Sequence, residues 1–262
     1  MTARFRTAFS LAAVAALALA GCSSTAGDAP TGASGVSLVT PGSLTVCTNP
    51  PYEPFEYKDG DTIVGLDIDI VQQVADDLDV DLVLVETGFD GIQSGAALSA
   101  KMCDVVASGI TITEERAGKL DFSAPYFDAN QGLLTKADAG LESVESLAGK
   151  KIGVQQATTG ETFAEDNGLE AASYEDLGLQ VQALKNGDVD GIINDIAVLG
   201  PYASGEYVIG AEFSTGEQYG LGVKKGNTDL LDAVDATIAR IQSDGTYSTI
   251  YTTYIGVPST DG

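Results

Sequence analysis

Along residues 43–125, stretches with the apolar pattern of a strand alternate with stretches that have the apolar pattern of a helix. Short apolar runs predict strands, and apolar residues spaced three or four apart predict helices; in the first helix Val71, Val74 and Leu78 share one face. The predicted strands cover residues 44–48, 80–85 and 105–108, and the predicted helices cover residues 69–78 and 92–98. This alternation indicates an α/β unit with a mostly parallel sheet.

The same alternation starts again after Tyr126. The second set has strands at residues 151–154 and 191–194 and helices at residues 160–166 and 177–184. A helix end followed by a buried strand occurs in both halves, at residues 100–105 and 184–189. We therefore expect two similar lobes. Ligands of open α/β sheets bind at the carboxyl ends of strands, so the residues of interest follow Cys47, Ala107, Val154 and Ile193.

The N-terminus has the pattern of an export signal. Arg4 and Arg6 precede an apolar run at residues 11–20, which is too short for a bilayer span of about 20 residues. The sequence Leu-Ala-Gly-Cys ending at Cys22 resembles a bacterial lipobox, whose cysteine receives a diacylglyceryl group and becomes the new N-terminus. Residues 1–21 are thus expected to be a lipoprotein signal peptide, with an ordinary secretory signal as the alternative. Residues 22–42, rich in small and polar residues, are expected to be a flexible tether.

Composition narrows the chemistry further. The chain of 262 residues has 13 basic and 38 acidic side chains, a net charge of −25 and no histidine. Ser-His-Asp and Cys-His pairs and imidazole metal sites are therefore excluded. The negative charge argues against a nucleic-acid partner, which needs a basic surface. Removal of residues 1–21 would take away two arginines and no acid, which makes the net charge −27.

Two cysteines remain if Cys22 is lipidated. They are Cys47 and Cys103, and an exported compartment permits a disulfide between them. Each lies in a short strand-like run, so a bridge between adjacent strands is sterically reasonable. Two buried free thiols are the alternative.

Five motifs together resemble the bacterial extracellular solute-binding proteins of the polar amino-acid class, family 3, over about residues 43–256. They lie at residues 51–56, 65–70, 108–127, 155–161 and 245–251. The resemblance implies a periplasmic-binding-protein-like type II fold, with two Rossmann-like α/β lobes joined by two crossing strands. The implied boundaries are residues 43–125 and 220–256 for lobe I, 131–214 for lobe II, and 126–130 and 215–219 for the crossing strands.

An amino-acid ligand needs donors for its carboxylate. Arg116 fits because a guanidinium is planar, permanently charged and bidentate toward carboxylates, and the resemblance gives the arginine of this motif that role. A helix ion pair is the alternative. Ser108, Gly109 and Thr111 lie just before a short helix capped by Thr113, where free N–H groups would also favour an anion.

The ligand ammonium needs an acid, and the resemblance makes Asp195 that partner. Its alternative role is the N-cap of a following helix. Thr158 and Thr159 resemble the donors that the second lobe offers to the carboxylate, with Gln155 placed to contact the ligand side chain. Loop and helix-cap chemistry is the alternative for both threonines.

The remaining predicted contacts concern the ligand side chain. Tyr52 and Phe89 match positions where the family places that side chain between two aromatic faces, and core packing is their alternative role. Asn49 stands where many cationic or glutamine-binding relatives carry an aspartate; an amide can both donate and accept hydrogen bonds. A basic ligand would then need charge from another acid: Glu53, Asp90 or Glu161.

Other acidic pairs do not form recognisable sites. Asp59 with Asp61, and Asp188 with Asp190, lack the remaining ligands of a calcium loop. Asp67 and Asp69 precede a helix and are expected to have capping and structural roles. We therefore expect no bound metal and no cofactor.

The resemblance implies a lipid-anchored receptor on the outer face of the cell membrane. It would bind a polar L-amino acid, with a cationic or amide side chain, by closure of the two lobes, and deliver it to the permease and ATPase subunits of an ABC importer. We expect a monomer that is not an enzyme and that touches the membrane only through its anchor. The alternatives are an exported arogenate or prephenate dehydratase, with Glu161 or Glu53 as general acid, and an amino-acid sensor acting in trans.

Overall fold

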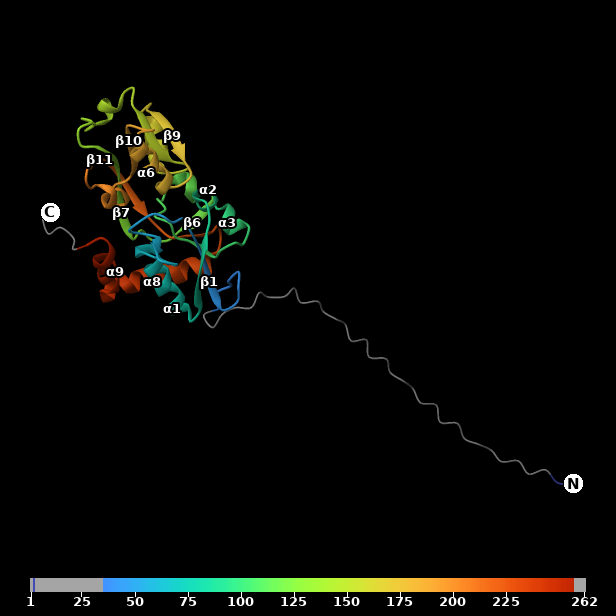
Figure 1. Cartoon of the computed structure of the whole chain (residues 1–262). Coiled ribbons are helices and arrows are strands. Elements are labelled where there is room, and N and C mark those ends of the chain that lie inside the picture. Colours follow the sequence, from blue (N-terminus) through green and yellow to red (C-terminus); the bar gives the residue numbers. More distant parts are fainter. Residues whose placement is uncertain (1, 3–34, 257–262) are drawn as a thin grey trace.

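The computed structural model describes residue 2 and residues 35–256, which form two α/β lobes, one above the other in Figure 1. The predicted signal peptide, the lipobox cysteine and most of the predicted tether lie outside the described residues. Each lobe is built on its own five-stranded sheet with helices packed against it.

The first sheet has the strand order β4-β1-β5-β12-β6. Its strands are β1 (Ser43–Thr48), β4 (Asp81–Glu86), β5 (Val105–Val106), β6 (Leu120–Phe122) and β12 (Gly222–Lys224). β1 pairs in parallel with β4 and β5, whereas β12 enters antiparallel between β5 and β6. A strand from the far end of the chain therefore completes this sheet.

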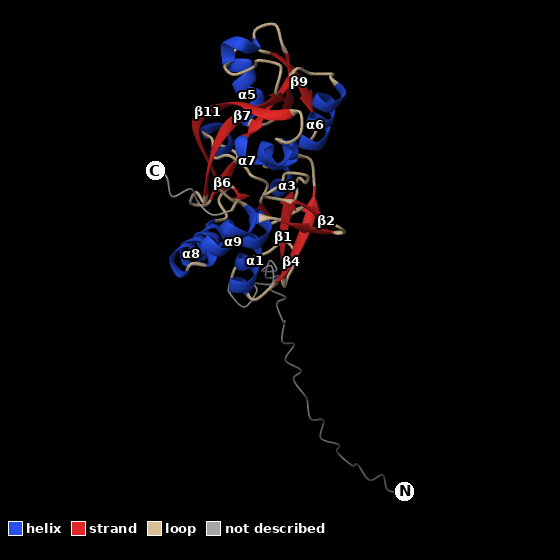
Figure 2. Ribbon diagram, turned by 60° about the vertical axis from the view of Figure 1, so that its left-hand side comes forward, coloured by secondary structure: helices blue, strands red, loops and turns tan. Residues whose placement is uncertain are grey.

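The helices of this lobe are α1 (Leu66–Leu78), α2 (Phe89–Gln93), α3 (Ala96–Ser99), α4 (Glu114–Ala117), α8 (Thr228–Asp244) and α9 (Thr246–Tyr254). Helices α1, α8 and α9 pack on one another at one end of the molecule (Figure 2). The predicted apolar face of α1 is confirmed, because Val71, Val74 and Leu78 are buried. A short hairpin of β2 (Tyr57–Asp59) and β3 (Thr62–Val64) precedes α1.

The second sheet has the order β11-β7-β10-β8-β9. Its strands are β7 (Phe127–Lys136), β8 (Lys151–Gln155), β9 (Glu170–Tyr174), β10 (Gly191–Asp195) and β11 (Tyr207–Tyr219). β8, β9 and β10 are parallel, and the long strands β7 and β11 pair antiparallel with each other and run from this sheet toward the first lobe. The short elements here are η1 (Val144–Leu147), α5 (Thr159–Asp166), α6 (Leu177–Asn186), α7 (Ile196–Leu199) and η2 (Gly200–Tyr202).

Two local expectations need correction. Residues 92–98 are not one helix: α2 ends at Gln93 and α3 begins at Ala96, because Gly95 adopts φ 70°, a left-handed conformation that interrupts a right-handed helix. The end of the predicted tether is packed, since Val36 and Leu38 are buried and the N–H of Val39 donates to Asp104 Oδ1 at 2.6 Å. Apolar residues at alternate positions explain this burial.

Cys47 and Cys103 form a disulfide, with their Cα atoms 5.7 Å apart. Cys47 lies on β1 and Cys103 lies two residues before β5, the parallel neighbour of β1. The predicted pairing of these two cysteines is thus present, and it ties the two strands that lead into the candidate site. Within residues 35–256, no helix combines the length and apolarity that a membrane crossing requires.

Candidate functional site

The predicted site residues come together where the two lobes face each other. Asn49 follows β1 and Ser108 follows β5 in the first lobe, while Gln155 ends β8 and Asp195 ends β10 in the second. These are carboxyl ends of strands, as expected for an open α/β sheet. Direct hydrogen bonds cross from one lobe to the other here, including one from Gln155 Nε2 to Asn49 Oδ1 at 3.2 Å.

Arg116 is a buried cation in the middle of this region, with 4% of its surface exposed. Its Nη1 donates to the carbonyl of Thr111 at 2.9 Å, and its Nη2 donates across the lobes to the carbonyl of Ala157 at 3.0 Å. The guanidinium carbon lies 5.3 Å from the centroid of the Phe89 ring. The predicted cap is confirmed, since Thr113 Oγ1 accepts from the Arg116 N–H. Backbone carbonyls and an aromatic ring thus hold the guanidinium in place.

No acidic side chain of residues 35–256 forms an ion pair with Arg116. Burial lowers its pKa, while the charges of Asp195 and Glu217 act in the opposite direction. A guanidinium remains protonated at any physiological pH. A buried charge without an ion-pair partner is costly, so this position is suited to an anion supplied from outside the chain.

The loop before Arg116 is held from behind. The Gly109 N–H donates to Asp67 Oδ2 at 2.9 Å, and Ser108 Oγ donates to Glu56 Oε1 at 2.5 Å while it accepts from the Asn49 N–H at 3.2 Å. The N–H of Gly109 is therefore not a free donor, contrary to expectation. Gly109 has φ 48°, and a Cβ on it would lie 2.6 Å from the Tyr52 ring, so only glycine fits here.

Asp195 is a buried carboxylate with donors on both oxygens. Its Oδ2 accepts from the Tyr52 hydroxyl at 2.8 Å and from the Tyr219 hydroxyl, and its Oδ1 accepts from Gln131 Nε2. Burial raises its pKa to about 6, which the bonds from Tyr219, Tyr52 and Gln131 partly counteract. Asp195 precedes α7, but its side chain makes no capping bond. Its carboxylate is therefore oriented toward the lobe interface rather than toward its own helix.

Sequence reasoning missed Gln131 and Glu217, which lie on the two long strands. Gln131 Nε2 also contacts Glu217 Oε2 at 2.8 Å and Thr159 Oγ1 at 3.2 Å, so it connects the predicted threonine and aspartate to β11. Gln131 is fully buried in β7. No local pattern marked Gln131, because its neighbours are Asn130 and Gly132, and it lay one residue beyond the expected crossing strand.

The second-lobe threonines have different surroundings. Thr158 caps α5, since its hydroxyl accepts from the Glu161 N–H at 3.2 Å and donates to the Gln155 carbonyl at 2.7 Å. Thr159 instead faces Gln131. The cap role thus accounts for the Thr158 hydroxyl, and Thr159 is the threonine connected to the buried network.

The structure places Tyr52 and Phe89 in different surroundings. Phe89 lies against Arg116, as described above, and Tyr52 turns its hydroxyl to Asp195 and to Asn194 Oδ1 at 2.9 Å. Asn49 is held by the Thr87 carbonyl, 2.9 Å from its Nδ2. Two amide side chains therefore meet here, Asn49 from one lobe and Gln155 from the other.

Glu161, one of the acids considered as a charge partner for a basic ligand, already accepts hydrogen bonds from nearby groups. Its carboxylate accepts from the Ala157 N–H at 2.7 Å and from the Ser173 hydroxyl. Glu53 lies on a separate concavity lined by Pro50, Pro51 and Tyr202. Among residues 35–256, no group of three or more potential ligands is arranged to hold a metal ion.

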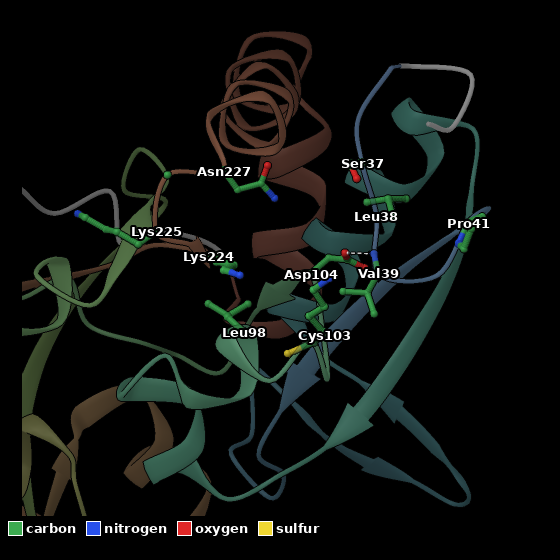
Figure 3. Close-up of a pocket in the computed structure, with 12 residues that line it drawn as sticks. Ser37, Leu38, Val39, Pro41, Leu98, Cys103, Asp104, Lys224, Lys225 and Asn227 are labelled. Carbon is green, nitrogen blue, oxygen red and sulfur yellow. Dashed lines mark hydrogen bonds between the residues drawn. The ribbon is translucent and has the colours of Figure 1, made fainter. Parts of the chain in front are cut away.

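A concavity of about 440 Å³ lies elsewhere on the first lobe (Figure 3). Its wall includes Leu38, Cys103, Asp104 and Lys224, and none of the predicted ligand contacts. The Asp104 carboxylate is already bonded to the Val39 and Thr45 N–H groups. The chemistry of the candidate site is therefore at the lobe interface and not in this hollow.

The chain resembles known amino-acid-binding proteins over most of its length. It is 33% identical over 227 residues to the L-cystine-binding protein TcyJ of Escherichia coli strain K12, covering 84% of this chain and 85% of the relative. An ancestral arginine-binding protein bound to arginine superposes with a TM-score of 0.77 at 37% identity, covering 82% of this chain and 99% of that one. The ancestral amino-acid-binding protein AncCDT-1, a precursor of cyclohexadienyl dehydratase, gives 0.75 at 34% identity and covers 82% and 95%.

These likenesses agree with the fold, which is the type II architecture of periplasmic amino-acid-binding proteins. The curated relatives are amino-acid-binding proteins of ABC transporters, and family members are extracytoplasmic. The family described as bacterial extracellular solute-binding proteins, family 3, matches residues 44–257. The chain belongs to that family.

Proposed function

We propose that this protein is a receptor outside the cytoplasm that binds a polar L-amino acid between its lobes and delivers it to the permease and ATPase subunits of an ABC importer. The observation that carries the proposal is Arg116, a buried guanidinium with no carboxylate partner among residues 35–256. The ligand carboxylate would be its partner. The ligand ammonium would bind Asp195, whose carboxylate lies in the same interface.

Binding would be coupled to closure of the lobes. Arg116 and Tyr52 belong to one lobe and Ala157 and Asp195 to the other, and hydrogen bonds join them in the described arrangement. A ligand that bridges Arg116 and Asp195 gains both contacts only when the lobes are together. Its differential affinity for this arrangement would shift the population toward closure, and the importer would recognise the closed shape.

The ligand side chain is proposed to be cationic or an amide. Asn49 and Gln155 present amide oxygens and nitrogens at this end of the site. The interface also has an excess of negative charge around Arg116, because Asp195 and Glu217 both act electrostatically on this one guanidinium. A net positive ligand would balance that excess. The similarity to an arginine-binding protein supports the same class.

A thermal screen tests the proposal. The chain from Ser23, refolded to remove carried-over ligand, would be heated with each of the twenty amino acids, ornithine, citrulline and cystine. Ligand at 100 times its dissociation constant stabilises by about 2.7 kcal/mol. A shift confined to cationic or amide amino acids is expected. No shift with any compound, from protein shown to be folded, would overturn the proposal and would make arogenate or prephenate turnover the next assay.

The proposed anchor has its own test. Cells expressing the full chain would be labelled with a radioactive fatty acid, and Cys22→Ser would be the matched variant. Label on the native chain and none on the variant is expected. Equal absence of label, with both chains exported, would indicate an ordinary secretory signal instead. Unchanged amino-acid uptake after gene deletion would favour a sensor over an importer subunit.

A further inference from the structure

Two carboxyl groups are buried directly behind the loop that leads to Arg116. Glu56 and Asp67 are both 0% exposed, and the charge of Asp67 raises the pKa of Glu56. No lysine or arginine of residues 35–256 forms an ion pair with either of them. Two adjacent buried carboxylates without a cation are strongly disfavoured, so the pair must hold a proton.

The hydrogen bonds indicate which carboxyl holds it. Asp67 accepts two bonds, from the Gly109 N–H at 2.9 Å and from the Tyr126 hydroxyl at 2.8 Å, and both stabilise its charged form. Glu56 accepts one bond, from Ser108, and its Oε2 is buried without a hydrogen-bond partner. The negative charge is therefore better accommodated on Asp67 and the proton on Glu56.

Among residues 35–256, one aspartate and two tyrosines interact electrostatically with Glu56. They are Asp67 on α1, Tyr52 in the preceding loop and Tyr126 before β7. Burial and the charge of Asp67 raise the pKa of Glu56 well above its usual range, and burial raises that of Asp67 to about 6. Glu56 thus has the more strongly raised pKa of the two carboxyls, which agrees with the placement of the proton on Glu56 from the hydrogen bonds.

Glu56 reaches the candidate site through one hydroxyl. The Ser108 hydroxyl donates a hydrogen bond to Glu56 and accepts one from the Asn49 N–H. This hydroxyl therefore connects the loop after β5 to the loop after β1, and both loops carry predicted ligand contacts. The neighbouring Gly109 is fixed by Asp67 in the same way. An ionised Glu56 would add a second negative charge behind a loop whose proposed role is to bind a carboxylate.

We propose that Glu56 is a positioning residue that keeps its proton at neutral pH, so that it supports the Ser108 loop without repelling the ligand carboxylate. This inference rests on the proposed receptor function. Raising the pH would release the proton to solvent, and ligand affinity would fall. At an effective dielectric constant of about 20, one charge about 10 Å from a carboxylate would weaken binding roughly tenfold.

The test uses Glu56→Gln, which copies the shape of the neutral acid and cannot ionise. The first measurement needs no ligand: melting temperatures of the native chain and the variant between pH 5 and pH 8. In the native chain the unfolded state loses the Glu56 proton near pH 4.3 while the folded state keeps it. Native stability should therefore fall as the pH rises, and the variant should gain roughly 10 °C relative to the native chain over this range.

Glu165→Gln is the matched control, because Glu165 is an exposed acid on α5 and should show no such pH-dependent gain. A difference between Glu56→Gln and the native chain that does not change with pH would overturn the proposal, because Glu56 would then be ionised in the folded protein. This outcome is independent of whether any amino acid binds.

The second measurement is calorimetric titration with L-arginine, and with L-glutamine, between pH 6.5 and 8.5. The ratio of the native dissociation constant to that of Glu56→Gln should rise toward roughly tenfold with pH, while the Glu165→Gln control follows the native chain. A constant ratio would overturn the link between the proton and the ligand. Failure of the receptor function itself would look different, since the native chain would then bind neither amino acid at any pH.

Discussion

The two charged ends of the candidate site are built in different ways. Arg116 is positioned by groups near it in sequence, the Thr111 carbonyl and the Thr113 cap, and it contacts the second lobe only through the Ala157 carbonyl. Asp195 is held by Tyr52, Gln131 and Tyr219, which are between 24 and 143 positions away. One end is assembled within a motif, and the other depends on the lobes and the long strands being together.

This difference suggests that the two ends act at different stages of ligand binding. The Arg116 end can form in the first lobe alone and could receive the ligand first. The Asp195 end is complete only when Tyr52 of the first lobe reaches the second. Closure would therefore depend on the Asp195 end, and variants of Arg116, Asp195 and Tyr52 are expected to separate the contributions of the two ends.

The largest expected effect is on the stability of the first lobe. Replacement of both Cys47 and Cys103 by serine removes a cross-link between positions 56 apart, which costs about 4 kcal/mol in the chain-entropy account. Chemical unfolding followed by circular dichroism measures the loss, and hydrogen exchange should locate it in β1 and β5 rather than in β8 and β10. Cys22→Ser is the control. Equal loss of protection in both lobes would show that the disulfide does not act locally.

Arg116→Ala tests the locally built end. Loss of the guanidinium leaves the ligand carboxylate buried without its partner, and we expect a cost of about 3 kcal/mol in binding, or more than a hundredfold in the dissociation constant. Calorimetric titration measures it. Arg240→Ala on α8, where the arginine is half-buried far from Arg116 in the sequence and paired with Asp77 and Asp244, should bind like the native chain. Native affinity in Arg116→Ala would disprove the assignment of this end.

Asp195→Asn tests the end that depends on closure, and we expect a cost of about 2 kcal/mol. The native protein should also bind more weakly as the pH falls through about 6, because the raised pKa of Asp195 means that the carboxylate becomes neutral there. The asparagine variant should lack this loss. Asp188→Asn, an exposed change in the same lobe, should retain it. A pH profile that is identical in Asp195→Asn and the native chain would contradict the ammonium role.

The smallest expected effect comes from Tyr52→Phe, which removes the hydroxyl that links the first lobe to Asp195. One hydrogen bond to a charged group contributes about 1.5 kcal/mol or somewhat more. If the hydroxyl senses closure, rapid-mixing kinetics should show faster ligand release and an almost unchanged rate of association. A loss confined to association would place Tyr52 in the first encounter instead.

The sequence predicted the fold well because each element carries its own signal. The apolar face of α1 and the caps Thr113 and Thr158 depend only on neighbours within a turn, and the structure confirms them. Cys47 and Cys103 were identified because they were the only candidate pair. The broken helix at Gly95 was missed because a glycine in a helical pattern does not reveal its φ angle.

The site was predicted unevenly, for a physical reason. Asp195 could be proposed from its place after a buried strand, but its donors come from three distant segments that no local pattern connects. Gln131 and Glu56 were missed because buried polar residues show their importance only through partners far away in sequence. The first-lobe motif was easier to interpret because its contacts lie within a few residues.

The central claim is that one lobe binds the ligand carboxylate through Arg116 while the other binds the ligand ammonium through Asp195. The most direct measurement is calorimetric titration of the native chain, Arg116→Ala and Asp195→Asn with L-arginine and with L-arginine amide, which lacks the carboxylate. We predict that Arg116→Ala greatly weakens binding of the free acid but not of the amide, whereas Asp195→Asn weakens both. An equal loss for acid and amide in Arg116→Ala would contradict this account.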